Sequence, residues 1–351
     1  MRAIGYDQRG EALRVLSLRE QPVPPAPAAG QVLVRVLARP IHPGDLVAVE
    51  GGLGAPGERF ATPRIAGIEG MGIIESTGDG EGTRDLRPGQ RVAFFPVPGS
   101  WSEFVTAPAE FVVPVPEQVS DEIAALMLVN PFTLRILLQA VDEARAGHAG
   151  AVLQTAAGSS IGKLVSAAAL KHGIPLVNLV RSAAGAQRLR ERFPALPTIS
   201  TADENWRAQV EEATGGQGPR VVLDAVGGSL TGDLVDLLAD GGTLITYGGL
   251  GAGSTPLSSL ALVPRELTVR GVSVSRWLTR TPAQRAEDIT FATGLASSAP
   301  ELLEVAAGYD LADFAAAIAH SRRPGKTGTV LLTSFTSLAG RESGASRRAT
   351  T

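Results

Sequence analysis

The stretch that decides the fold reads AVLQTAAGSSIG and runs from Ala151 to Gly162. Its first five residues are typical of a short buried strand, and the residues that follow, 156–160, have small side chains. A helical pattern begins at Ile161 and stops at Gly173. Small side chains let a ligand approach the backbone, and a helix beginning there offers amide groups to an anion. We expect this phosphate site to consist of Thr155, Ala157, Gly158, Ser159, Ser160 and Ile161. Judged from the turn alone, the alternative to a phosphate site is an ordinary strand-to-helix turn built of small residues.

Acidic residues are missing around this turn. Between Ala144 and Arg190 there is no Asp or Glu, yet the segment holds six basic residues in a chain of net charge −3. Proteins that prefer NAD carry an acid for the ribose 2′-hydroxyl about 20 residues after the turn. Here that place holds Arg181, which can grip a 2′-phosphate but cannot accept a hydrogen bond from a diol. The residues favour NADPH over NADH; the alternative is a solvated basic helix face.

Strands and helices alternate along the chain from this turn onward. Strand-like runs cover 151–155, 174–180, 220–225 and 242–247, and helical runs cover 161–172, 183–193 and 230–238. This alternation is typical of a doubly wound α/β fold with a parallel sheet.

Residues 1 to about 120 have a different texture. Residues 31–39 are rich in β-branched side chains and 91–95 form another short apolar run, with proline clusters between such runs. They predict a small, barrel-like all-β unit.

The texture changes near Ser120, where an N-cap and two acids begin a helical pattern that continues through Leu138. A short helix over 311–320 and a strand over 329–333 come last, followed by small polar residues. We expect a β-rich domain over 1–121, a nucleotide-binding domain over 122–298, a return segment over 299–333 and a disordered tail over 334–351.

Composition excludes several classes of protein. The 351-residue length favours two domains, and 44% hydrophobic residues are too many for a disordered chain. With 32 basic and 35 acidic residues, the chain has no excess of positive charge that would favour binding to nucleic acid or an anionic membrane. No run approaches 18 apolar residues and the start lacks a signal-peptide core, so we expect a soluble, cytoplasmic protein that acts on a small molecule.

Metal chemistry can be judged separately. The chain has no cysteine, which excludes disulfides, thiol nucleophiles and Cys-ligated zinc. Four histidines occur without ligand spacing: His42, His148, His172 and His320. We therefore expect no metal.

Seven further stretches follow one another along the chain: PIHPGD at 40–45, GIEG at 67–70, RPGQRV at 87–92, VNPFT at 129–133, VGG at 226–228, TYGGL at 246–250 and RGVSVSRW at 270–277. Their collinear order over 1–333 resembles the medium-chain dehydrogenase/reductase superfamily. The Asn-Pro-x-Thr and Tyr-Gly-Gly elements and the AxxSxxG turn are similar to its zinc-independent 2-enoyl thioester reductase and quinone oxidoreductase branch. Ile68 stands where zinc-using relatives have the His of Gly-His-Glu.

This resemblance implies a Rossmann-type doubly wound sheet plus a GroES-like β-rich catalytic domain, with the active site in the cleft between them. It also implies a homodimer through edge strands. The implied activity is NADPH-dependent reduction of the C=C bond of an α,β-unsaturated carbonyl or an enoyl thioester, without metal. Two alternatives stay open: an NADPH:quinone oxidoreductase, and an NADPH-binding protein with little catalysis.

The resemblance also assigns site residues. Asn130 and Thr133 would line the nicotinamide or substrate pocket, or else cap a helix. The expected contacts to the cofactor or its pocket are Tyr247, Gly248, Gly249, Leu250, Trp277 and Lys326. For Tyr247 the alternative is a buried core position, for Trp277 a core or dimer-interface position, and for Lys326 a solvated loop.

One implied residue is absent. Enoyl reductases of this branch carry a proton-donating Tyr where this chain has Leu53, and leucine cannot donate a proton. His42, the nearest titratable residue of the same motif, is the candidate replacement. Alternatively water protonates the enolate, the acceptor needs no dedicated acid, or His42 only bonds to its own loop.

Overall fold

The structure, a computed structural model, describes residues 1–52, 55, 57–145, 147–251 and 253–334. Leu53 and the expected tail from 335 onward lie outside the described residues. The chain divides into two compact units, Met1–Val129 with the segment from Ala292, and Asn130–Phe291. Helices α4 (Val129–Arg145) and α10 (Pro282–Ser298) carry the chain across the divisions. The expected divisions differ from these: 121 is the first residue of α3, ahead of α4, and 298 is the last residue of α10.

The first unit contains a seven-stranded sheet in the order β15-β16-β3-β5-β6-β8, with β7 also paired to β3, and a three-stranded sheet β2-β1-β4. The strands are β1 (Arg2–Gln8), β2 (Ser17–Glu20), β3 (Gln31–Pro40), β4 (Arg59–Ile65), β5 (Gly70–Thr77), β6 (Arg91–Phe94), β7 (Phe104–Pro108), β8 (Val112–Pro114), β15 (Val305–Asp310) and β16 (Thr329–Thr333). The helices are α1 (Ala12–Val15), α2 (Pro43–Glu50), α3 (Asp121–Ala124) and α11 (Phe314–Ser321). Alternate residues of β3 (Val32, Val34 and Val36) are fully buried against Ile74 and Phe94.

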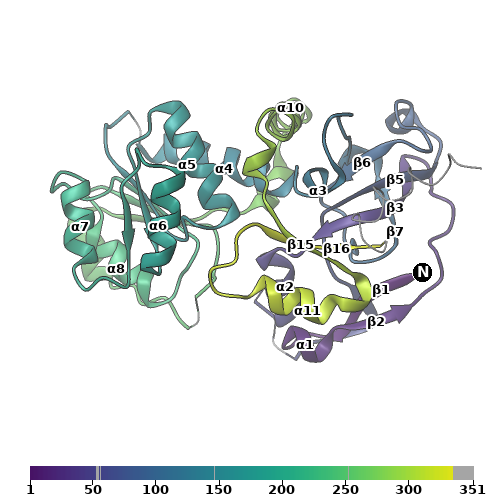
Figure 1. The fold of residues 1–351 in the computed structure, drawn as a ribbon, viewed down its shortest axis with the longest axis horizontal. Helices are drawn as coiled ribbons and strands as arrows, with labels where there is room; N and C mark the ends of the chain where they lie inside the picture. Colours follow the sequence, from purple (N-terminus) through teal and green to yellow (C-terminus); the bar gives the residue numbers. More distant parts are fainter. Residues whose placement is uncertain (53–54, 56, 146, 252, 335–351) are drawn as a thin grey trace, which may run out of the picture. The chain divides into compact units, whose positions relative to one another are not determined.

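The end of the chain returns to the first unit. β16 pairs antiparallel with β3, with Leu331 opposite Pro40, and β15 pairs parallel with β16 (Figure 1). The fully buried Arg39 donates from Nη1 to the Leu332 carbonyl at 3.3 Å, and burial lowers the pKa of Arg39 to about 9. Ser334, which the sequence placed in the tail, donates its N–H to the Leu37 carbonyl at 3.1 Å.

The second unit is a six-stranded parallel sheet in the order β11-β10-β9-β12-β13-β14. The strands are β9 (Val152–Gln154), β10 (Leu176–Val180), β11 (Thr198–Ser200), β12 (Val221–Asp224), β13 (Thr243–Thr246) and β14 (Thr268–Gly271). The other helices of this unit are α5 (Ser160–His172), α6 (Ala183–Arg192), α7 (Trp206–Ala213), α8 (Ser229–Leu237) and α9 (Ser259–Leu262). The predicted doubly wound parallel sheet is confirmed, because strand order reverses between β9 and β12.

The single helix predicted from Ser120 is wrong in one respect. Ser120 does cap a helix, since its side chain accepts the Ile123 N–H at 3.3 Å, but α3 ends at Ala124. A turn follows, and α4 begins anew at Val129 with Pro131 in its first turn, where no donor is required. Within the described ranges, no helix has both the length and the apolar character needed to span a bilayer.

Candidate functional site

The turn after β9 is a tight connection into α5. Ala156 has a left-handed conformation with φ of 48°, and Ser159 Oγ accepts the N–H of Gly162 at 3.1 Å. A Cβ on Gly162 would lie 2.6 Å from the Cα and the carbonyl oxygen of Ala157. Only glycine therefore lets α5 begin this close to the turn.

Two amides of this turn are available. Those of Gly158 and Ile161 make no hydrogen bond within the described part of the chain, whereas Ala157 and Ser159 donate to protein carbonyls. A Cβ at Gly158 would meet nothing within 4 Å, so the fold does not itself require glycine there. Open access to unpaired amides at the start of a 13-residue helix is an arrangement suited to phosphate.

Arg181 lies at the same edge of the sheet as this turn. It directly follows β10, which pairs in parallel with β9 so that Asn178 is opposite Gln154. Arg181 is exposed and forms no hydrogen bond or ion pair with the described residues. Burial, helped by the positive charges of Arg192 and Arg188, lowers the pKa of Lys163 in α5 to about 8. Such a cationic surrounding attracts an anion.

Asp224, the last residue of β12, anchors the loop beside the turn. Its carboxylate is fully buried and accepts four hydrogen bonds. Oδ1 accepts from Thr155 Oγ1 and the Val226 amide, both at 2.9 Å, and Oδ2 from Thr231 Oγ1 at 2.7 Å and the Gly227 amide at 3.2 Å. Thr155 is thus a partner of Asp224 whose hydroxyl is already engaged.

The loops after β12 and β13 are joined by backbone hydrogen bonds. The Tyr247 amide donates to the Asp224 carbonyl at 2.9 Å, and the Leu250 amide to the Ala225 carbonyl at 3.1 Å. A Cβ on Gly248 would lie 2.8 Å from that Ala225 oxygen, whereas Gly249 has open space. The carboxyl ends of three adjacent strands therefore form one surface, the edge at which α/β sheets bind ligands.

The Tyr247 hydroxyl is buried and has no hydrogen-bond partner among the described residues. Burial, and secondarily the Asp224 carboxylate, raises the pKa of Tyr247, so the hydroxyl keeps its proton. A buried hydroxyl without a partner is costly, and such donors in native proteins call for an explanation. A bound polar ligand would supply one.

A second polar cluster lies in the first unit, around Glu69. This carboxylate is 1% exposed; its Oε1 accepts the Leu128 and Val129 amides at 3.1 and 2.7 Å. Its Oε2 lies 2.5 Å from Nε2 of His42, the residue that precedes α2. Glu69 therefore holds the start of α4 and the His42 ring at once.

Two groups of this cluster, His42 and Asp45, have shifted pKa values. Burial alone would lower the pKa of His42, but the hydrogen bond and charge of Glu69, with the charge of Asp45, raise it above its usual value against the opposing charge of Lys326. Burial raises the pKa of Asp45 to about 6, although the His42 charge and the hydrogen bond from the His42 amide oppose this. Lys326 donates from Nζ to the Gly328 carbonyl at 2.7 Å.

The remaining expected residues lie in the second unit. Asn130 is buried in the first turn of α4, and Thr133 follows one turn later. Trp277 is 1% exposed, its ring stacked on Phe132 at 4.9 Å with the Arg285 guanidinium 5.5 Å from its centroid. The indole is therefore buried against Phe132 and Arg285, and its expected place beside the cofactor stays a prediction.

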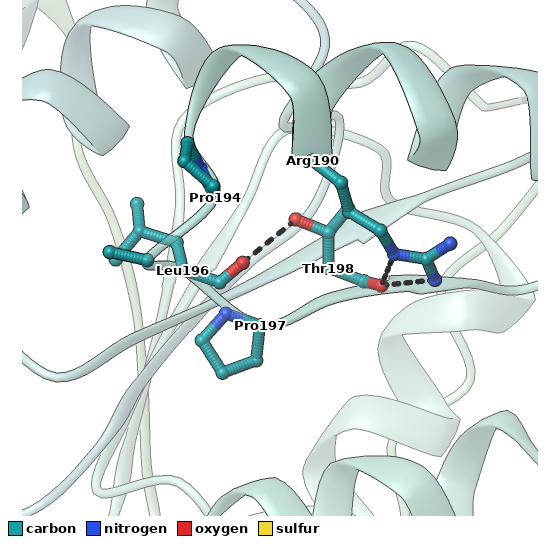
Figure 2. Close-up of a pocket in the computed structure, with 6 residues that line it drawn as sticks. Arg190, Pro194, Leu196, Pro197 and Thr198 are labelled. Atoms are coloured by element: carbon teal, nitrogen blue, oxygen red, sulfur yellow. Dashed lines mark hydrogen bonds between the residues drawn. The ribbon is translucent and has the colours of Figure 1, made fainter.

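A hollow of about 420 Å³ lies elsewhere on this unit (Figure 2). Arg190, Leu196 and Thr198 line it, and Arg190 donates to the Thr198 carbonyl at 2.7 Å. It lies between the end of α6 and the start of β11, hence at the amino edge of the sheet, opposite the loops described above. This hollow is therefore not the candidate site.

Sequence reasoning missed two buried acids, Glu69 and Asp224. Asp224 closes the apolar run Val221–Leu223 at the carboxyl end of an expected strand, and Glu69 stands in an apolar, glycine-flanked stretch. A charged residue bordered in this way is almost never buried without partners, and this signal could have singled out both.

Two family models match the chain. The alcohol dehydrogenase GroES-like domain matches residues 28–117, and the zinc-binding dehydrogenase domain matches residues 160–290. The mitochondrial enoyl-acyl-carrier-protein reductase of Caenorhabditis elegans is 29% identical over 289 residues, 78% of each chain.

The chain is also similar to solved structures of proteins complexed with NADPH. The Escherichia coli quinone oxidoreductase complexed with NADPH has 25% identity and a TM-score of 0.80, over 95% of this chain and 100% of that one. A mycobacterial protein complexed with NADPH has 26% identity and a TM-score of 0.81, over 95% and 99%.

These likenesses and the fold place the chain in the medium-chain dehydrogenase/reductase superfamily of oxidoreductases. Within that superfamily it belongs to the branch of enoyl reductases and quinone oxidoreductases, as the sequence motifs predicted. One matching model is named for zinc, but Ile68 and the lack of cysteine remove its usual ligands. Among the described residues, no group of three or more His, Cys, Asp or Glu side chains is arranged to hold a metal.

Proposed function

We propose that the protein is an NADPH-dependent reductase of the C=C bond of an α,β-unsaturated carbonyl or enoyl thioester. The relatives named as enoyl reductases carry this proposal, together with the phosphate-binding geometry of the turn after β9. When bound, NADPH supplies the hydride for this reduction. We also propose that the reaction needs no metal.

The second unit has the features that NADPH binding requires. The Gly158 and Ile161 amides and the open space at Gly158 suit the pyrophosphate, with Ser159 and Ser160 beside them. Arg181 is the proposed partner of the 2′-phosphate. The unpartnered Tyr247 hydroxyl and the neighbouring Gly248, Gly249 and Leu250 form the adjoining wall. The proposed roles of Asn130, Thr133 and Lys326 follow the resemblance alone.

In this proposal His42 supplies the proton that the substrate α-carbon requires. Its bond to Glu69 orients the ring, and the hydrogen bond and charge of Glu69 raise the pKa of His42, which favours the protonated ring. Because Leu53 cannot donate a proton, the proton must come from another donor, and His42 is the proposed one.

The test compares NADPH oxidation with a short enoyl thioester, an enone and a quinone in parallel. Thioester or enone turnover is expected. Turnover of quinones alone would instead identify an NADPH:quinone oxidoreductase, the function favoured by the structural relatives and by Leu53. If NADPH binds but none of the three is reduced, a binding protein with little catalysis remains.

The NADPH preference has its own test, because it depends on Arg181. Calorimetry should give tighter binding of NADPH than NADH, and Arg181→Ala should weaken NADPH about tenfold to a hundredfold while leaving NADH unchanged. Arg188→Ala is the control, since Arg188 lies on α6 in the same basic region. Equal binding of both dinucleotides to the wild type would contradict the preference.

For the catalytic proton, the solvent isotope effect and rate of His42→Ala are compared with those of the wild type. A lower rate and an altered isotope effect are expected. Unchanged values would remove His42 from the mechanism.

We also propose a homodimer and a cytoplasmic location. β14 is an edge strand, and exposed apolar side chains of the preceding segment, Leu257, Leu260 and Val263, lie near it in sequence. A second copy covering this edge predicts twice the monomer mass in sedimentation experiments, and a monomeric mass after Leu260→Asp.

A further inference from the structure

Asp224 is the centre of a hydrogen-bond network in the second unit. Its carboxylate reaches the end of β9 through Thr155 Oγ1, the loop 225–228 through two amides, and α8 through Thr231 Oγ1. Thr155 Oγ1 also accepts the Ala225 amide at 2.9 Å. The Asp224 carbonyl accepts the Tyr247 amide, which adds the loop after β13. One residue thus connects three turns at the carboxyl edge of the sheet.

We propose that Asp224 is a positioning residue for NADPH, which fixes the loops 225–228 and 247–251 against the turn after β9. This inference rests on the proposed function, since it concerns the same dinucleotide site. Asp224 does not touch the cofactor in this account. It acts through Thr155, the loop amides and the Tyr247 backbone, and so determines the shape of the surface that the dinucleotide meets.

The geometry explains why a carboxylate is needed. Both oxygens face a backbone amide, Oδ1 that of Val226 and Oδ2 that of Gly227. In Asp224→Asn one oxygen becomes an NH₂ group, and whichever way the amide turns, this donor meets one of the two backbone donors. The variant therefore breaks the loop anchor while keeping the volume and shape of the side chain.

The experiment measures NADPH binding by calorimetry in the full-length protein. Asp224→Asn should weaken NADPH at least about tenfold, because a hydrogen bond to a charged group is replaced by a donor–donor contact. With substrate, the KM for NADPH should rise while kcat changes less than about threefold.

Two further variants keep the test decisive if Asp224→Asn folds poorly. Thr231→Val removes one donor to the carboxylate and should weaken NADPH about threefold to tenfold, whereas Thr231→Ser keeps the hydroxyl and should restore wild-type binding. Leu234→Ala removes a fully buried core side chain of α8 and is the matched control. It should lower the thermal midpoint without changing NADPH affinity.

The outcomes separate the two proposals. Wild-type protein that gives no heat with NADPH overturns the proposed function and this inference together. Wild-type protein that binds NADPH, with Asp224→Asn and Thr231→Val binding equally well, overturns the inference alone. A loss of affinity in Leu234→Ala as large as that in Thr231→Val would also overturn it, because destabilisation alone would then explain the effect.

Discussion

Glu69 and His42 show how one buried residue controls another. The bond of 2.5 Å between them and the burial of both side chains mean that the pKa of His42 depends on the Glu69 carboxylate. His42 was singled out from the sequence because of its motif, but its partner is 27 residues away and becomes adjacent only in the fold. For the same reason the four donors to Asp224 could not be named from sequence, although the VGG motif at 226–228, which directly follows this region, could.

We expect Glu69→Gln to lower the pKa of His42 below its usual value. The substitution removes the hydrogen bond and charge that raise this pKa and leaves the burial that lowers it. Nitrogen-15 imidazole NMR of the four histidines measures the change directly, with His148 and His172 as internal controls. An unchanged or raised His42 pKa would refute the account of the pair.

The raised pKa of His42 also predicts how stability varies with pH. The folded-state pKa lies above the unfolded value of about 6.5, so the stabilisation from protonated His42 is complete below that pH and is lost as pH rises through the folded value. Urea unfolding of wild type and His42→Gln between pH 5.5 and 9 should show a difference in stability that shrinks toward alkaline pH. A difference independent of pH would contradict this linkage.

At the level of elements, capping residues and glycines predicted where helices begin and end. The apolar spacing was a poorer guide to whether one helix continues without a break. Ser120 and Gly173 mark a helix start and a helix stop as predicted. The pattern after Ser120 reads as one helix because its apolar spacing continues, but Glu69 takes up the amides at the start of α4 and so supports a new helix there. α10 was not predicted, since its apolar residues do not gather on one face.

Two glycines of the turn after β9 should respond differently to a methyl group. Gly162→Ala places a Cβ 2.6 Å from Ala157 and should destabilise the protein by about 1–3 kcal/mol. Gly158→Ala meets open space and should change stability by less than about 0.5 kcal/mol, yet weaken NADPH binding. Thermal unfolding without ligand and calorimetry with NADPH distinguish the two effects. A strongly destabilising Gly158→Ala would contradict the assignment of that space to a ligand.

For the whole molecule, alternation of strands and helices sufficed to predict a doubly wound sheet, and the motifs predicted the superfamily. The order of the strands in the sheet could not be predicted from the sequence. The pairing of β9 with β12 joins residues about 70 apart, and no local pattern specifies such a partner.

The position of β16 between β15 and β3 has a consequence for synthesis on the ribosome. The second unit is a contiguous segment and is complete once Phe291 has emerged, while the first unit must wait for the last strand. Until then the end of β3 from Ala38 to Pro40 lacks its β16 partner, and Arg39 lacks its Leu332 acceptor. Nascent chains stalled after residue 304 should therefore be cut by protease in the first 129 residues and protected in the middle segment. Equal protection of both would mean that the early strands mature without their final neighbour.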